Sequence, residues 1–127
     1  MAHATATIGR DRYATSIDAS GHAITADEPE KLGGANAGPA PYDLLLASLG
    51  ACTAITLRMY ADRKEWPLEL LDVHLRLTGG ADDRRIVRTI APKGLDAEQA
   101  ARLADIAERT PVTLTLKSGI GIDTSLA

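Results

Sequence analysis

The fold of this chain is decided by residues 39–66, PAPYDLLLASLGACTAITLRMYADRKEW. The middle of this stretch, residues 44–57, carries no charged side chain. A segment that is apolar on nearly every face belongs inside a membrane or inside a protein core. A membrane-spanning helix needs about 20 such residues, and this run is shorter and is followed at once by charged side chains. We therefore predict a core helix and no membrane insertion.

The flanking residues carry the start and stop signals of a helix. Pro41 suits the first helical position, where its missing N–H costs nothing. Asp43 then lies in the first turn, where the helix dipole favours negative charge. Basic side chains occupy the last turns, and Pro67 ends the pattern. We predict one long helix over residues 41–65, which carries the only cysteine of the chain, Cys52.

Length and composition indicate a single globular domain over residues 1–127. The net charge of −3 and the four aromatic residues, one Trp and three Tyr, argue against a nucleic-acid partner. A single cysteine forms no intrachain disulfide, and no N-terminal apolar run resembles a signal peptide. We predict a cytoplasmic protein with neither a nucleic-acid nor a membrane partner.

The residues before the long helix alternate loosely between polar and apolar side chains, which predicts two or three strands. A hairpin is expected between residues 13–17 and 22–25, joined by a type I turn at residues 18–21. Residues 27–40 are rich in Gly and Pro and are predicted to form a surface loop. A phosphate cradle is disfavoured there, because the loop matches neither a P-loop nor G-x-G-x-x-G.

After the long helix, residues 72–78 alternate as a half-buried strand, and residues 84–90 supply its partner across a glycine turn. Asp96 and Gln99 have the spacing of a capping box, so a second, shorter helix follows and ends at Thr110-Pro111. Residues 112–117 alternate again and predict a strand, with another after Gly119. The order of elements predicts an α+β fold with a largely antiparallel sheet.

Cys52 is the first candidate for chemistry. Its face of the helix is mostly apolar, and a free cysteine in such surroundings often behaves as a small buried hydrophobe. A reactive Cys52 would need a cation to stabilise its thiolate. The residue pattern alone favours packing and leaves the reactive interpretation open.

Other polar residues offer no complete site. The three histidines lie far apart in the sequence, which disfavours a metal centre: His3, His22 and His74. No cofactor is predicted. A cluster of basic residues is interpreted as a solvated strand edge: Arg84, Arg85 and Arg88. A hydrolase that uses Ser48 or Thr53 as the nucleophile has only the presence of these hydroxyls in its favour, because no base is evident.

The chain resembles the OsmC/Ohr proteins over nearly its whole length. Residues 27–68, DEPEKLGGANAGPAPYDLLLASLGACTAITLRMYADRKEWPL, look like the glycine loop, central helix and family cysteine of that group. Residues 3–11, HATATIGRD, resemble its first strand and turn. Residues 103–116, LADIAERTPVTLTL, occupy the place of its second helix and a Cys-Pro-Val-His segment.

The resemblance implies an α+β fold that is complete only as an intertwined homodimer, with two central helices packed together and reactive sites at the subunit interface. It also implies a stress-response thiol peroxidase that reduces organic hydroperoxides. Cys52 matches the peroxidatic cysteine, and Arg10 matches the arginine that stabilises its thiolate. Without the resemblance, Arg10 is equally well a solvated turn residue.

Two departures from the family pattern bear on the mechanism. Thr110 stands where the family has its second cysteine, and Thr113 stands where it has a histidine. Because Thr forms no disulfide, an external thiol or the partner subunit's Cys52 must reduce an oxidised Cys52. The family's Glu after Pro41 is also missing.

The acid nearest to that position is Asp43, nine residues before Cys52. On a regular helix this spacing places the two side chains on opposite sides. Asp43 is therefore expected to act first as a helix-start residue, and as an active-site acid only if the first turn is irregular.

Two functions remain open from the sequence. The leading hypothesis is reduction of organic hydroperoxides through a Cys52 sulfenic acid, with Arg10 as activator and an external thiol as reductant. Organic hydroperoxides are favoured over hydrogen peroxide, because the apolar face around Cys52 suits an alkyl group. The alternative is a non-catalytic homodimer that binds an apolar small molecule and uses Cys52 for core packing.

Overall fold

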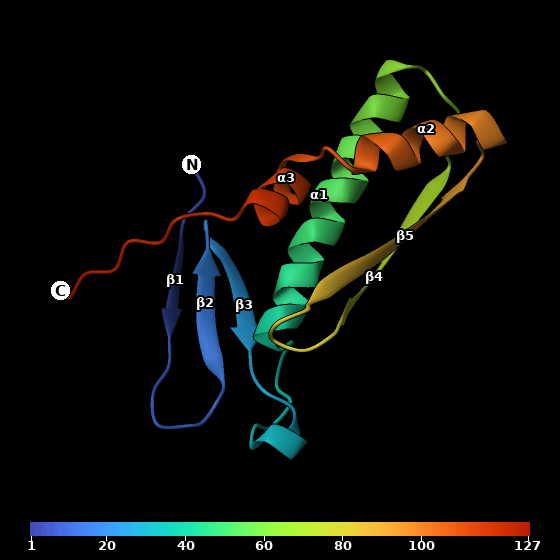
Figure 1. Cartoon of the computed structure of the whole chain (residues 1–127). Helices are drawn as coiled ribbons and strands as arrows, with labels where there is room; N and C mark the ends of the chain where they lie inside the picture. The colour runs from blue at the N-terminus through green and yellow to red at the C-terminus, as the bar shows by residue number, and fades with distance from the viewer. The chain divides into compact units, whose positions relative to one another are not determined.

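Three α-helices and two antiparallel sheets confirm the predicted α+β class (Figure 1). The computed structural model describes residues 1–127. Its elements are, in chain order, β1 (Ala4–Thr7), β2 (Thr15–Ala19), β3 (His22–Ala26), the short 3-10 helix η1 (Glu30–Leu32), α1 (Pro41–Arg63), β4 (Leu70–Thr78), β5 (Arg85–Lys93), α2 (Ala97–Ala107) and α3 (Pro111–Ser118). They form two compact units, Met1–Leu45 and Leu46–Ala127.

The N-terminal unit contains an antiparallel sheet in the order β1-β2-β3, which confirms the predicted hairpin. The predicted type I turn was wrong by one residue. Ala19 pairs with His22, so only Ser20 and Gly21 form the loop, and both have positive φ, +50° and +89°. Positive φ at both central residues defines a type I′ turn, whose twist matches that of the flanking strands.

The glycine-rich loop after β3 is organised around the Asp27 carboxylate. Asp27 is buried and accepts four backbone N–H groups, from Tyr13, Glu28, Ala35 and Ala37. The hydrogen bond from Ala37 contributes most to lowering the pKa of Asp27 below its usual value. The loop is thus folded back on its own first residue.

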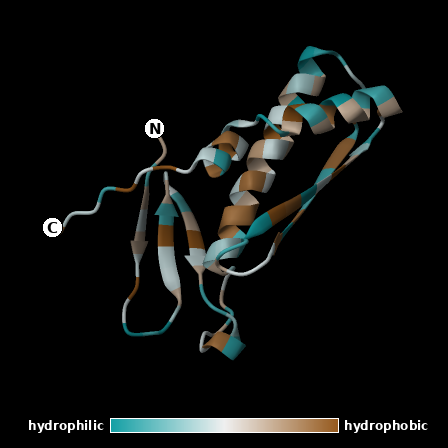
Figure 2. Cartoon of the chain, viewed as in Figure 1, coloured by the Kyte–Doolittle hydropathy of each residue, from teal (hydrophilic) through white to brown (hydrophobic).

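In the C-terminal unit, α1 buries residues spaced four apart, which places them on one face: Leu49, Thr53, Leu57 and Ala61. Leu57 and Ala61 form the core with Leu68 and with Leu103 and Ala107 of α2. Apolar segments recur along α1 in Figure 2. The predicted long helix is confirmed, with its end at Arg63.

By length and composition alone, α1 could also cross a membrane, because the complete helix is longer than its uncharged middle. Core helices of soluble proteins pass the same test. The buried face of α1 packs against other elements of the chain, as a core helix does.

Strands β4 and β5 pair in register from Leu70 with Lys93 to Thr78 with Arg85, as predicted but over longer segments. Helix α2 begins at the predicted capping box, where Asp96 accepts the Gln99 N–H at 2.8 Å and the Gln99 side chain accepts the Asp96 N–H at 3.1 Å.

The strand predicted over residues 112–117 was wrong, because α3 occupies Pro111–Ser118. Pro111 follows the end of α2 and is also the first residue of α3, a position that proline favours. The buried side chain of Thr113 is held by hydrogen bonds in the helical conformation. After Gly119 the chain has no regular secondary structure, so the second predicted strand is also absent.

Candidate functional site

Cys52 lies in the middle of α1 and is half-buried. Its Sγ accepts a hydrogen bond from the backbone N–H of Val112, with a sulfur-to-nitrogen distance of 3.4 Å. The donor belongs to the segment that resembles the family's Cys-Pro-Val-His. The middle of α1 and the start of α3, which are 60 residues apart in sequence, therefore meet at the Cys52 sulfur.

The donor is available because of where α3 begins. Thr110 is the N-cap, Pro111 is the first helical residue and Val112 is the second. The first N–H groups of a helix have no partner within it, and the helix dipole makes this end positive. The sulfur of Cys52 thus lies beside the first N–H groups of α3, at the end of the helix that carries partial positive charge.

Arg88 connects the three helices of the C-terminal unit. Its Nη1 donates to Thr53 Oγ1 on α1 and to Thr113 Oγ1 on α3, both at 2.9 Å. Its Nη2 donates to the carbonyl oxygen of Ala107 at the end of α2, at 2.8 Å. The interpretation of Arg88 as part of a solvated strand edge was wrong, because only 11% of its side chain is exposed.

The hydroxyl groups beside Cys52 are held by this arrangement. Thr53 Oγ1 donates to the Leu49 carbonyl at 2.7 Å and accepts from Arg88. Thr110 Oγ1 and Thr113 Oγ1 lie 2.6 Å apart. Both Thr110 and Thr113 are buried, so the two positions where the family has Cys and His belong to a closed network of hydroxyl groups. Cys52, in contrast, is only half-buried.

The other two predicted site residues belong to the N-terminal unit. Asp43 Oδ2 accepts the N–H of Ala40 at 3.0 Å, which is the expected contact of a helix-start residue. Arg10 is exposed in the connection between β1 and β2. Both residues lie in Met1–Leu45, whereas Cys52 lies in Leu46–Ala127, and the catalytic roles of Arg10 and Asp43 remain predictions.

Arg88 is the residue that sequence reasoning missed. It stands between Ile86 and Ile90 at a spacing of two, and all three are at least half-buried along β5. On a strand, residues i, i+2 and i+4 line one face. A charged residue on the same strand face as two apolar residues was the sequence signal that Arg88 points inward. No group of three or more His, Cys, Asp or Glu side chains could hold a metal ion.

Comparison with known proteins places the chain among its relatives. A family model described as OsmC-like protein matches residues 33–125. The chain belongs to the OsmC-like family. The matched region of this OsmC-like chain includes Cys52, Asp43 and the whole of α3, and it begins after Arg10. No curated protein sequence matches the chain.

Solved structures support the OsmC-like fold. A Psychrobacter arcticus protein named for osmotic stress induction and detoxification response is 24% identical, with a TM-score of 0.77 and coverage of 91% of this chain and 88% of the other. An OsmC-like protein of Mycoplasma pneumoniae has 20% identity, a TM-score of 0.72 and coverages of 92% and 87%. The organic hydroperoxide resistance protein OsmC of Legionella pneumophila has 21% identity, a TM-score of 0.67 and coverages of 92% and 89%.

Proposed function

We propose that this OsmC-like protein acts in the stress response by reducing organic hydroperoxides with Cys52. The observation that carries the proposal is the hydrogen bond from the Val112 N–H, at the start of α3, to Cys52 Sγ. A donor in this position stabilises negative charge on sulfur, and the thiolate is the reactive form of cysteine. The name of the Legionella protein, organic hydroperoxide resistance protein, supports the choice of substrate.

In the first step, the thiolate sulfur attacks one oxygen of the hydroperoxide O–O bond. A sulfur–oxygen bond forms, the O–O bond breaks and the alkoxide leaves with the bonding electron pair. The alkoxide takes up a proton to give an alcohol. Cys52 is oxidised by two electrons to a sulfenic acid, and the hydroperoxide is reduced by two.

An external thiol completes the cycle. Thr110 offers no sulfur where the family has its second cysteine, and the chain has no other cysteine. One thiol attacks the Cys52 sulfenic sulfur and releases water, which gives a mixed disulfide. A second thiol attacks the mixed disulfide, restores Cys52 and leaves as the oxidised external disulfide.

The remaining roles follow the family pattern. Arg10 stabilises the thiolate and donates hydrogen bonds to the departing oxygen. Asp43 fixes the start of α1, and its part in the active site is secondary to that contact. The protein is a cytoplasmic homodimer, and the alkyl substituent of the substrate lies against the apolar face of α1 around Cys52.

A turnover assay tests this function. Wild-type protein with dithiothreitol is expected to consume cumene hydroperoxide catalytically, and Cys52→Ser is expected to have no activity above background. Ser48→Ala is the matched control, since Ser48 is an exposed residue one turn earlier on α1. Equal consumption by wild type and Cys52→Ser would contradict the proposal and would favour the non-catalytic homodimer that binds an apolar small molecule.

A further inference from the structure

A cavity lies within the C-terminal unit, lined by residues of α1, β5, α3 and the end of α2. Its volume is about 610 Å³, within the range of small-molecule sites. Four cationic side chains line it: Arg84, Arg85, Arg88 and Lys117. Cys52 is not among the lining residues, so the cavity is distinct from the sulfur and its immediate contacts.

Arg85, Arg88 and Lys117 together carry more positive charge than the one carboxylate of the lining can balance. Glu108 is the single acidic residue of the lining. Its carboxylate accepts from Lys117 Nζ at 3.0 Å and from Arg88 Nη2 at 3.4 Å. The Lys117 hydrogen bond lowers the pKa of Glu108, so this carboxylate is ionised at neutral pH. The contacts of Glu108 show that Lys117 and Arg88 bind an oxyanion. The cavity still carries a surplus of positive charge, although the net charge of the whole chain is −3.

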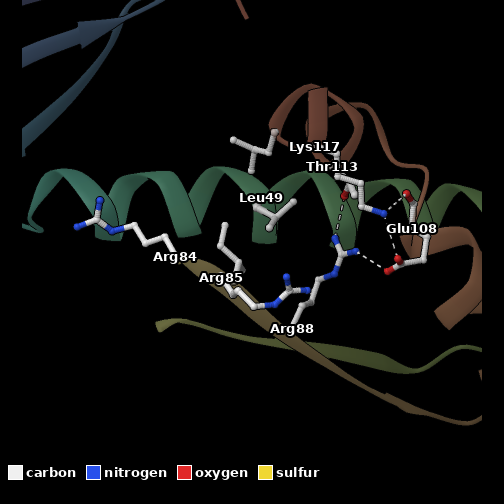
Figure 3. Close-up of a pocket in the computed structure, with 9 residues that line it drawn as sticks. Leu49, Arg84, Arg85, Arg88, Glu108, Thr113 and Lys117 are labelled. Carbon is white, nitrogen blue, oxygen red and sulfur yellow. Dashed lines mark hydrogen bonds and ion pairs between the residues drawn. The ribbon is translucent and has the colours of Figure 1, made fainter. Parts of the chain in front are cut away.

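The side chains that line the cavity form a charged part and an apolar part. In Figure 3 the side chains of Arg85 and Arg88 both extend below α1, while Arg84 extends in the opposite direction. Leu49, Ile86 and Leu116 supply the apolar part of the lining. A ligand that fits both parts carries an oxyanion at one end and a hydrocarbon body at the other.

We propose that this cavity binds a small organic anion whose carboxylate or phosphate group is held by Arg85, Arg88 and Lys117. The guanidinium group of Arg85 pairs with either oxyanion through two parallel hydrogen bonds, and the ammonium group of Lys117 adds a point charge. Arg88, whose Nη atoms already donate to groups of the protein, adds positive charge. The apolar body of the ligand packs on Leu49 and Leu116. This site does not depend on the reaction at Cys52.

NMR titration tests the proposal with hexanoate, hexyl phosphate and hexanol. Both anions are expected to shift the side-chain Nε–Hε signals of Arg85 and Arg88. The anion that binds with the higher affinity, hexanoate or hexyl phosphate, identifies the preferred head group. Hexanol is expected to leave these signals unchanged at the same concentration. The same shifts are expected in Cys52→Ser, which separates this site from the peroxidase proposal.

Charge variants locate the binding. Arg85→Gln or Lys117→Gln is expected to weaken binding of the anions about fivefold, as for the loss of one partly solvated ion pair. Glu108→Gln is expected to strengthen binding, because it removes the internal carboxylate that competes for Arg88. Arg76→Gln is the matched control, since Arg76 is an exposed cation on β4 outside the lining. Equal binding of hexanol and hexanoate, or unchanged affinity in Arg85→Gln and Lys117→Gln, would overturn the proposal.

Discussion

At the scale of single residues, buried charge in this chain is accompanied by a full set of hydrogen bonds. Arg88 has three acceptors besides the half-exposed Glu108, and no buried side-chain nitrogen or oxygen lacks a partner. A buried polar group without a partner is costly. The same rule explains Asp27, whose carboxylate collects the backbone N–H groups of the glycine-rich loop.

Asp27 should make the stability of the N-terminal unit depend on pH. Its pKa is lowered in the folded protein, first by the Ala37 N–H, so ionised Asp27 stabilises the fold above the unfolded pKa of about 3.9. That contribution is lost as the pH falls through the folded pKa. In urea denaturation, Asp27→Asn is expected to lower the midpoint at neutral pH, and the difference from wild type should shrink below about pH 4.

Asp11→Asn is the control for this experiment, because Asp11 is an exposed acid of the same unit. It is expected to leave the urea midpoint almost unchanged at both pH values. A difference between wild type and Asp27→Asn that grows on acidification would show that the carboxylate does not stabilise the loop.

At the scale of elements, the patterns that identified α1 and α2 were unambiguous, whereas that of α3 was not. An uncharged run cannot form a solvated strand, and a capping box marks a helix start. In residues 112–117, β-branched residues alternate with Leu, which is also the pattern of a strand. Burial of Thr113 and its contact with Arg88 outweigh local propensity, and that tertiary contact is invisible in the sequence.

Arg88 shows the same limit within the candidate site. Cys52 could be identified from its position in the core helix and from the family resemblance. The contacts of Arg88 join residues 25 and 35 positions apart in sequence, and only the packed helices bring them together. Similarly, nothing in the sequence indicated that a backbone N–H would reach the sulfur.

The start of α3 provides a direct test of how Cys52 is activated. Val112→Pro removes the N–H that donates to Sγ, at a position in the first turn of a helix where proline is tolerated. Oxidation of Cys52 by cumene hydroperoxide is expected to slow by about tenfold, the equivalent of roughly 1.4 kcal/mol for one hydrogen bond to a charged group.

Val112→Ala is the matched control, because it removes the side chain and keeps the N–H. Its oxidation rate is expected to stay near that of wild type, while circular dichroism confirms that both variants are folded. Similar rates in all three proteins would show that the Val112 hydrogen bond does not activate the sulfur.

At the scale of the whole molecule, α1 exposes apolar side chains that a partner subunit would cover. Ile55 is 55% exposed and Met59 is 60% exposed, and both line an apolar groove of about 460 Å³ with Leu70. Large exposed apolar patches mark interaction surfaces. This surface supports the proposed homodimer through the central helices.

Sedimentation analysis tests the homodimer. Wild-type protein is expected to sediment as a dimer, and Ile55→Lys is expected to shift it toward the monomer, because the substitution would place an unpaired charge in the interface. Val87→Lys is the control, since Val87 is a partly exposed apolar residue on β5 outside this groove. A monomeric wild-type protein would contradict the proposed dimer.

The central claim, that Cys52 reacts with organic hydroperoxides, is tested most directly by intact mass. Reduced wild type and Cys52→Ser are treated with stoichiometric cumene hydroperoxide or hydrogen peroxide, with and without a sulfenic-acid trap. Rapid trapping is expected on wild type alone, and it is expected to be faster with cumene hydroperoxide than with hydrogen peroxide. An unmodified Cys52 after prolonged exposure would contradict it and would leave a cysteine that only packs.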